Sequence, residues 1–314
     1  MSAAVFRSLE EARGGFGPCA LSIGNFDGVH IGHRALIAEV VRFAAENGVA
    51  PGVLTFHPHP TVVVAPERTP LMITTLEQRI RLLESAGVTR ILVLPFTSEV
   101  ARLSPREFAE GILVQALGTK AVFVGENFHF GHRQAGTPET LRALGEEFGF
   151  VSHFMQPVMW RSEVVSSSAI RGYLKAGKVG RAGRLLGRCF SLEGAVVAGH
   201  GVGSRQTVPT LNLRPVEGQL VPRGVYITET REESGGRRWQ SITNCGIRPT
   251  FGGDELTIET FLLSLFEEPR PEGIEVYFRR FVREERQFPS PKALKAQIFK
   301  DVGRARAYWR RLEG

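Results

Sequence analysis

The stretch Gly24-Asn25-Phe26-Asp27-Gly28-Val29-His30-Ile31-Gly32-His33 organises the first half of this 314-residue chain. It follows an apolar run at residues 20–23, typical of a buried strand, and leads into residues 34–44, whose apolar positions recur at helical spacing. The two histidines therefore lie on a turn that opens a helix, where backbone N–H groups lack partners and the helix dipole is positive. Such a turn predicts a phosphate site, since its glycines let an anion approach the backbone.

Apolar strand-like runs alternate with helical patterns from residue 19 to about residue 156, which predicts βαβ units and a mostly parallel sheet. Helices are expected at residues 76–86, after Thr74 or Thr75, and at residues 108–117, after Ser104. The expected strands are residues 19–23, 52–56, 90–94, 121–125 and 150–155.

Segments rich in His, Gly, Pro or Ser follow four of these strands. The signature stretch follows the first, residues 55–60 end the second, residues 126–132 follow the fourth, and residues 166–171 come after the fifth. Because ligands bind beyond the carboxyl ends of parallel strands, we expect these segments to share one edge of the sheet and form one site.

The second half has a different pattern. Helical residues run from 169 to about 186, and from residue 189 strand alternation and turn residues predict a small antiparallel barrel or sandwich, closed by a helix after Ser290. We expect two domains, residues 1–184 and 185–314. The expected strands of the second are residues 191–198, 224–230, 238–244, 256–265 and 274–282.

Composition excludes several classes of protein. The chain is 42% hydrophobic and 23% charged, with no apolar run of membrane-spanning length and no signal-peptide core in residues 1–18. Cys19, Cys189 and Cys245 are isolated, which suits a reducing compartment, so we expect a cytoplasmic protein. The net charge of +7 is spread along the chain and indicates a solvated basic surface rather than nucleic-acid binding.

The ten-residue signature contains the His-x-Gly-His motif of nucleotidyltransferases, and with its flanks it resembles the first module of bacterial bifunctional riboflavin kinase/FAD synthetases. The resemblance covers about residues 17 to 311. It implies an α/β nucleotidyltransferase domain (Rossmann-like, HxGH), then a small antiparallel β-barrel riboflavin kinase domain with a C-terminal helix. It also implies ATP, riboflavin and FMN as substrates and Mg²⁺ as cofactor: the barrel would phosphorylate riboflavin, and the first domain would adenylylate FMN to FAD.

For adenylyl transfer the resemblance implies His30, His33 and Arg171 as catalytic hydrogen-bond donors; an ionised phosphate nucleophile needs positioning and charge stabilisation rather than a strong base. Residues 166–171 resemble the Ser-Ser-Thr-x-Ile-Arg motif of the same family, with Ser168 in place of Thr. ATP contacts in this domain are expected from Gly24, Phe26, Asp27, Gly28, Gly32, Ser166, Ser167 and Ser168. Flavin contacts are expected from His57, Pro58, Asn127 and Phe128.

Residues 203–213 resemble the glycine-rich loop and Pro-Thr-Ala-Asn motif of riboflavin kinases. This implies ATP contacts from Gly203, Thr210 and Asn212, with Thr210 and Asn212 also ligating Mg²⁺ through hard oxygen atoms. Glu259, taken alone, is an ordinary solvent-facing position of an alternating strand. The resemblance instead implies a general base for the riboflavin 5′-hydroxyl.

Alternatives remain at this stage. The paired histidines could ligate a metal, although no carboxylate or thiolate partners accompany them. The chain could be a single-activity nucleotidyltransferase acting on another small phosphate with a flavin-binding second domain, or a non-enzymatic flavin- or metal-binding protein. The expected partners are small molecules, without nucleic acid or membrane, and the expected state is a monomer or weak homo-oligomer.

Overall fold

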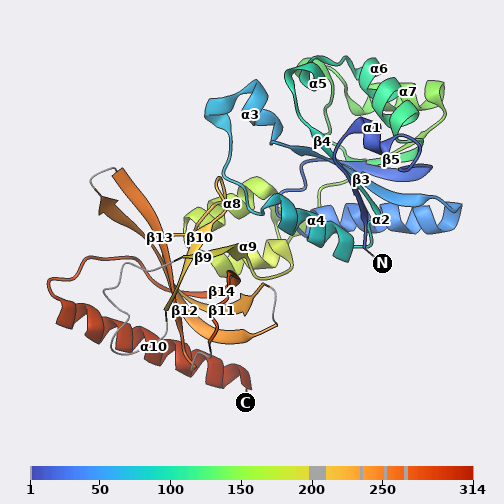
Figure 1. Cartoon of the computed structure of the whole chain (residues 1–314). Coiled ribbons are helices and arrows are strands. Elements are labelled where there is room, and N and C mark those ends of the chain that lie inside the picture. The colour runs from blue at the N-terminus through green and yellow to red at the C-terminus, as the bar shows by residue number, and fades with distance from the viewer. Residues whose placement is uncertain (1, 198–209, 234–235, 251–252, 265–267, 314) are drawn as a thin grey trace. The chain divides into compact units, whose positions relative to one another are not determined.

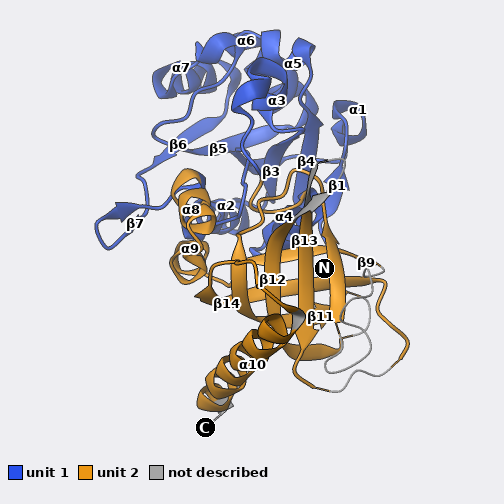
Figure 2. Ribbon diagram, turned by 90° about the vertical axis from the view of Figure 1, so that its left-hand side faces the viewer, with its two compact units in different colours: residues 1–71, 76–167 blue, residues 72–75, 168–314 orange. Residues whose placement is uncertain are grey.

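The computed structural model describes residues 2–197, 210–233, 236–250, 253–264 and 268–313 (Figure 1). The chain divides into two compact units, coloured separately in Figure 2. The first contains Met1–Leu71 and Leu76–Ser167, and the second contains Met72–Thr75 and Ser168–Gly314. The functional boundary expected between residues 184 and 185 stays a prediction.

The first unit is built on a six-stranded sheet in the order β1-β4-β3-β2-β5-β6. Every neighbouring pair is parallel, which confirms the predicted α/β architecture. The strands are β1 (Ala4–Phe6), β2 (Cys19–Ile23), β3 (Ala50–His57), β4 (Arg90–Pro95), β5 (Thr119–Gly125) and β6 (Val151–Met155). The short edge strand β1 is an addition to the predicted set.

Helices cover both faces of this sheet. Side chains of α2 and α4 pack with Val53 and Ile91 on one face, and those of α1, α7 and the π-helix η2 pack with Leu21 and Leu54 on the other. The helices are α1 (Leu9–Ala12), α2 (Ile31–Asn47), α3 (Pro60–Val64), α4 (Leu76–Ser85), α5 (Ser98–Arg102), α6 (Pro105–Glu107), η2 (Phe108–Ala116) and α7 (Pro138–Phe148), with short 3₁₀ turns at Pro66–Arg68 and His132–Gln134. A hairpin, β7 (Met159–Trp160) and β8 (Glu163–Val164), follows β6.

The expected helix at residues 108–117 differs in type. The capping box forms, because Ser104 Oγ accepts the Glu107 N–H at 3.2 Å and Glu107 accepts the Ser104 N–H at 2.8 Å. The helix then widens, and the Leu117 N–H bonds the carbonyl of Ile112 at 3.1 Å, five residues back. A π-helix therefore replaces the predicted α-helix.

The second unit is a closed antiparallel barrel in the order β10-β13-β12-β11-β14-β9, which confirms the predicted barrel. Its strands are β9 (Ser191–Val197), β10 (Thr210–Pro215), β11 (Gly224–Glu232), β12 (Arg238–Thr250), β13 (Gly253–Leu262) and β14 (Gly273–Arg283), and α10 (Pro291–Glu313) closes the chain. The single helical run expected at residues 169–186 is two helices, α8 (Ser167–Lys175) and α9 (Val179–Leu186). Gly177, at φ +69°, turns the chain between them.

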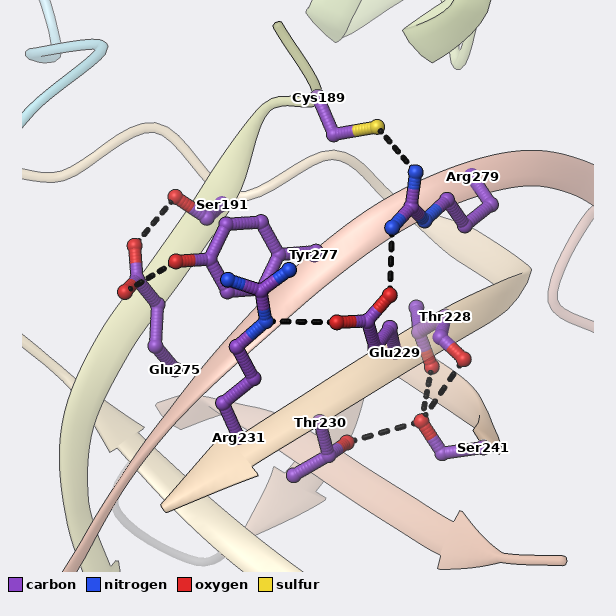
Figure 3. Close-up of polar contacts among 10 residues, drawn as sticks. All are labelled: Cys189, Ser191, Thr228, Glu229, Thr230, Arg231, Ser241, Glu275, Tyr277 and Arg279. Atoms are coloured by element: carbon purple, nitrogen blue, oxygen red, sulfur yellow. Dashed lines mark hydrogen bonds and ion pairs between the residues drawn. The ribbon is translucent and has the colours of Figure 1, made fainter. Parts of the chain in front are cut away.

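The barrel interior contains a connected set of hydroxyl groups (Figure 3). Thr228 Oγ1 bonds the hydroxyls of Ser241 and Thr243 at 2.8 and 2.7 Å, and Ser241 Oγ also bonds Thr230 at 2.8 Å. Thr243 Oγ1 in turn bonds Thr260 at 3.0 Å. Each of these side chains is fully buried, so the network satisfies groups that burial alone would penalise.

A second polar cluster lies on the outer surface of the barrel, centred on Glu229 (Figure 3). Arg231 Nε and an Arg279 guanidinium nitrogen donate to its two oxygens at 2.6 and 2.5 Å. Arg279 also donates to Cys189 Sγ at 3.3 Å, and its guanidinium lies 5.9 Å from the ring centre of Trp309 in α10.

In the part of the chain that the structure describes, no helix has the length and apolar character needed to cross a bilayer.

Candidate active sites

The signature loop follows β2 at the point where the sheet order reverses. From β2 the chain proceeds through β3 and β4 on one side, whereas β5 and β6 lie on the other. Open parallel sheets bind ligands beyond the carboxyl ends of their strands at such a switch point. The predicted segments after β2, β3 and β5 therefore share one edge of the sheet.

The loop has a strained backbone. Phe26 and Val29 have positive φ angles of 49° and 37°, a region that a β-branched residue such as Val rarely adopts. The Val29 N–H closes the turn on the carbonyl of Phe26 at 3.0 Å, and Phe26, Asp27 and Val29 are buried. Strain of this kind persists where the surroundings fix a conformation, which is typical of ligand-binding loops.

His30 is the N-cap of α2. Its Nδ1 accepts the backbone N–H of His33 at 3.2 Å, so this nitrogen is unprotonated and the proton of the neutral ring is on Nε2. A Cβ on Gly32 would lie 3.2 Å from two atoms of the His30 ring. Glycine at this position thus lets the imidazole fold back over the start of the helix.

The His33 ring stacks on the His30 ring, with centroids 3.6 Å apart and planes 16° from parallel. Burial, followed by electrostatic interactions with the neighbouring His30 and Arg79, lowers the pKa of His33 well below its ordinary value. His33 is therefore neutral near pH 7. It can donate a hydrogen bond, but it brings no positive charge to the loop, which depends on the α2 dipole for part of its attraction to anions.

The serine motif, residues 166–171, is hydrogen-bonded to the signature loop, residues 24–33. Ser167 Oγ donates to the carbonyl of Asp27 at 2.9 Å, across 140 residues of sequence. Ser166 is half-buried and Ser168 is exposed at the start of α8. Arg171 lies four residues beyond Ser167 in α8, in a stretch that clusters with the second unit, so its role stays a prediction.

The predicted flavin residues lie at the carboxyl ends of β3 and β5. His57, Pro58 and Asn127 are exposed, and partial burial and the charge of Arg79 lower the pKa of His57. Phe128 is half-buried and stacks on Phe130 at 5.6 Å between centroids, at the margin of the core. This leaves the first three side chains most open to a ligand.

The barrel brings the predicted kinase residues onto one face. In the strand register Asn212 of β10 is opposite Glu259 of β13, and Glu259 is also opposite Asn244 of β12. Directly opposed residues of antiparallel strands point to the same side, as do residues two apart, so Thr210 joins them. All four side chains are half-buried, whereas Gly203 lies outside the described residues.

Two residues that sequence analysis did not indicate lie beside the predicted ones: Asn244 is opposite Glu259, and Arg79 bonds Thr55 and Phe56 near the carboxyl end of β3. Asn244 shares the face of Glu259 only through barrel pairing, which sequence patterns do not show. Arg79 did leave a signal, because it lies three residues after Leu76 and four before Leu83 on the buried face of α4. Among the described residues no group of three or more His, Cys, Asp or Glu side chains is placed to hold a metal ion.

The chain matches two protein-family models. The FAD synthetase model covers residues 15–169 and the riboflavin kinase model covers residues 186–309. The structure is also similar to that of a Streptococcus pneumoniae protein described as a macrolide-efflux protein, with a TM-score of 0.86 and 26% identity over 98% of this chain and 99% of the other.

Curated relatives match over nearly their full length. A bifunctional riboflavin kinase/FMN adenylyltransferase of Pseudomonas fluorescens is 35% identical, covering 96% of each chain. The Escherichia coli K12 protein of the same description is 34% identical, covering 93% of each. This chain therefore belongs to the bifunctional riboflavin kinase/FMN adenylyltransferase family and has both of these enzyme activities.

Proposed function

We propose that the two reactions are divided between the units, with adenylylation of FMN in the first and phosphorylation of riboflavin in the second. The main support is the Ser167–Asp27 hydrogen bond, which joins both nucleotidyltransferase motifs at the carboxyl edge of the parallel sheet. The FAD synthetase match covers residues 15–169, so it includes the signature loop and the three serines of the second motif but ends before Arg171, and the riboflavin kinase match covers the barrel.

In the first reaction a phosphate oxygen of FMN attacks the α-phosphorus of ATP, and pyrophosphate leaves. This oxygen is already ionised at neutral pH, so the site acts by orientation and by donors aimed at the developing charge. The neutral donors are the Nε2–H group of His30, a ring N–H of His33 and the first backbone N–H groups of α2 other than that of His33, which His30 caps. Arg171 supplies a fixed positive charge for the departing phosphates.

Substrate contacts complete this site. Gly24 and Gly32 make room for the rings of Phe26 and His30, and with Gly28 they contact ATP through the backbone, while the buried Phe26 and Asp27 fix the loop. The motif hydroxyls of Ser166, Ser167 and Ser168 contact ATP. The exposed edge formed by His57, Pro58, Asn127 and Phe128 receives the flavin.

In the second reaction Glu259 accepts the proton of the riboflavin 5′-hydroxyl, which attacks the γ-phosphorus of ATP. An alcohol benefits from a base in a way that a phosphate does not. The amide oxygen of Asn212 and the hydroxyl of Thr210, on the same face as Glu259, are hard oxygen donors that fit Mg²⁺. When bound there, Mg²⁺ would neutralise phosphate charge, and Gly203 would contact the nucleotide.

A flavin chromatogram tests this division. Wild-type protein, Glu259→Gln and His33→Asn are each incubated with ATP and Mg²⁺ and with either riboflavin or FMN. We expect Glu259→Gln to lose about 10²-fold or more in FMN formation while still converting FMN to FAD. His33→Asn should accumulate FMN from riboflavin and form little FAD.

Matched controls are Glu272→Gln, an exposed carboxylate of the second unit, and His132→Asn, an exposed histidine of the first. Both should behave as wild type. Full kinase activity in Glu259→Gln would favour a single-activity nucleotidyltransferase with a flavin-binding barrel. A His33→Asn variant that still makes FAD at the wild-type rate would contradict the role of the signature loop.

The cysteines indicate the cellular compartment of the enzyme. The three cysteines are free, and burial raises the pKa of the Cys19 thiol to about 12, which keeps it protonated and unreactive. We therefore place the protein in the reducing cytoplasm. We also propose that it is a monomer or weak homo-oligomer acting on small molecules.

A further inference from the structure

Arg79 is a buried cation that the proposed reaction has not used. It lies on α4 with only 3% of its surface exposed, between residues that pack against the sheet. Arginine is almost never buried to this degree unless its guanidinium is held by specific partners. Here one guanidinium nitrogen donates to Thr55 Oγ1 and to the carbonyl of Phe56, both at 3.4 Å.

These contacts continue to the signature loop. Thr55, at the carboxyl end of β3, is fully buried, and its hydroxyl donates to the carbonyl of Asn25 at 3.2 Å. The Asn25 side-chain amide in turn lies 3.1 Å from His59 Nε2. Arg79 therefore stands at one end of a hydrogen-bonded path that runs through Thr55 to the backbone of the loop before His30.

The charge of Arg79 also acts on the histidines of this edge. After burial, which is the largest cause, it helps lower the pKa of His33 and of His57. A neutral His33 matters because its ring stacks on His30, whose Nδ1 must stay unprotonated to cap α2. A permanent cation nearby disfavours a second proton on the His33 ring.

We propose that Arg79 is a positioning residue for adenylyl transfer: through Thr55 its buried guanidinium fixes the backbone of the signature loop that precedes the His30–His33 pair. This role rests on the assignment of adenylyl transfer to the first unit. Arg79 makes no contact with the reacting atoms in this scheme and acts through Thr55, Asn25 and the histidine pair.

The test uses full-length Arg79→Met, Arg79→Lys and Arg81→Met. Arg81 is exposed on the same helix and controls for the loss of one charge. Conversion of FMN to FAD is measured from pH 5.5 to 8.5, giving kcat and the KM for ATP. Conversion of riboflavin to FMN, measured on the same preparations, is the internal control for a folded second unit.

We expect Arg79→Met to lower the kcat of FAD formation by about 10- to 100-fold, with the KM for ATP changed by less than about threefold, because the donors are misplaced rather than removed. The pH below which the rate of FAD formation by this variant declines should rise toward about 6.5, the ordinary pKa of histidine. Arg79→Lys should keep the wild-type acid limb but regain only part of kcat, since an ammonium lacks the planar fork. Arg81→Met, and the kinase activity of all variants, should match wild type.

Wild-type kcat and pH profile in Arg79→Met would overturn the role. Should Arg79→Met fail to fold by circular dichroism, Arg79→Lys settles the matter: a folded variant with wild-type kcat overturns the proposal, and reduced kcat at unchanged kinase activity supports it. If the wild-type protein forms no FAD from FMN while Arg79→Lys folds normally, the assignment of the first unit fails, and this role fails with it.

Discussion

Replacing His30 by alanine or by serine separates its two roles, capping α2 and donating a hydrogen bond to substrate. Alanine removes both the Nδ1 cap and the Nε2 donor. Serine removes the donor, but its hydroxyl can still accept the His33 N–H that His30 now accepts at 3.2 Å. The two variants lose the same buried imidazole, so the difference between them isolates the cap.

The size of this difference follows from general capping energies. Loss of an N-cap costs about 1 kcal/mol. In a unit of this size that shift lowers Tm by roughly 2–4 °C, so His30→Ser should unfold at a temperature higher by that amount than His30→Ala. Activity should not follow stability, since both variants lack the donor and should lose about 10²–10³ in the kcat of FAD formation.

The assay is thermal unfolding by circular dichroism, with initial rates of FAD formation measured well below both transitions. Riboflavin kinase activity should stay at the wild-type level in both variants. Equal unfolding temperatures would refute the cap and with it the assignment of the His30 proton to Nε2. Wild-type FAD formation in His30→Ser would refute the donor role.

Two further predictions concern charge. The pKa of His33 is lowered in the folded protein, so below about pH 6.5 the unfolded chain gains a proton that the folded one does not. The stability present above that pH is then lost by up to about 1.4 kcal/mol per pH unit as the pH falls. Urea unfolding from pH 7.5 to 5.5 should therefore show a smaller loss of unfolding free energy in His33→Asn than in the wild type. In the barrel, Glu229→Gln removes the carboxylate that Arg231 and Arg279 share. The cluster is only partly buried, so the free energy of unfolding should fall by about 1–3 kcal/mol, against less than about 0.5 kcal/mol for the exposed Glu272→Gln. Equal losses in these two variants would contradict the cluster's role.

The sheet could be predicted because its central strands are buried on both faces and form continuous apolar runs. The segments at residues 19–23 and 121–125 match β2 and β5 almost residue for residue. β1 was not predicted because three residues give too short a pattern, and it pairs with β4 alone. β10 escaped because its Thr-Leu-Asn-Leu-Arg-Pro sequence alternates without a strong apolar face.

The sequence indicates which segments form the sites, but it does not indicate how their side chains are oriented. Parallel topology alone puts His57 and Asn127 at one edge with the signature loop, and a sequence pattern indicates that topology. It does not reveal that the His30 ring folds back to cap α2, because that depends on the space beside Gly32. Nor does it reveal the partners of Arg79, which belong to a strand and a loop distant in sequence.

The polar interior of the barrel explains why the kinase residues meet. Side chains alternate along a strand, so a register slip of one residue would move every side chain to the opposite face. Thr243 and Thr260 are opposed inside the barrel and hydrogen-bonded at 3.0 Å, which specifies the pairing of β12 with β13. Their neighbours Asn244 and Glu259 must then be opposed on the outside. The pairing of the buried hydroxyls thereby places the proposed base beside its polar partners.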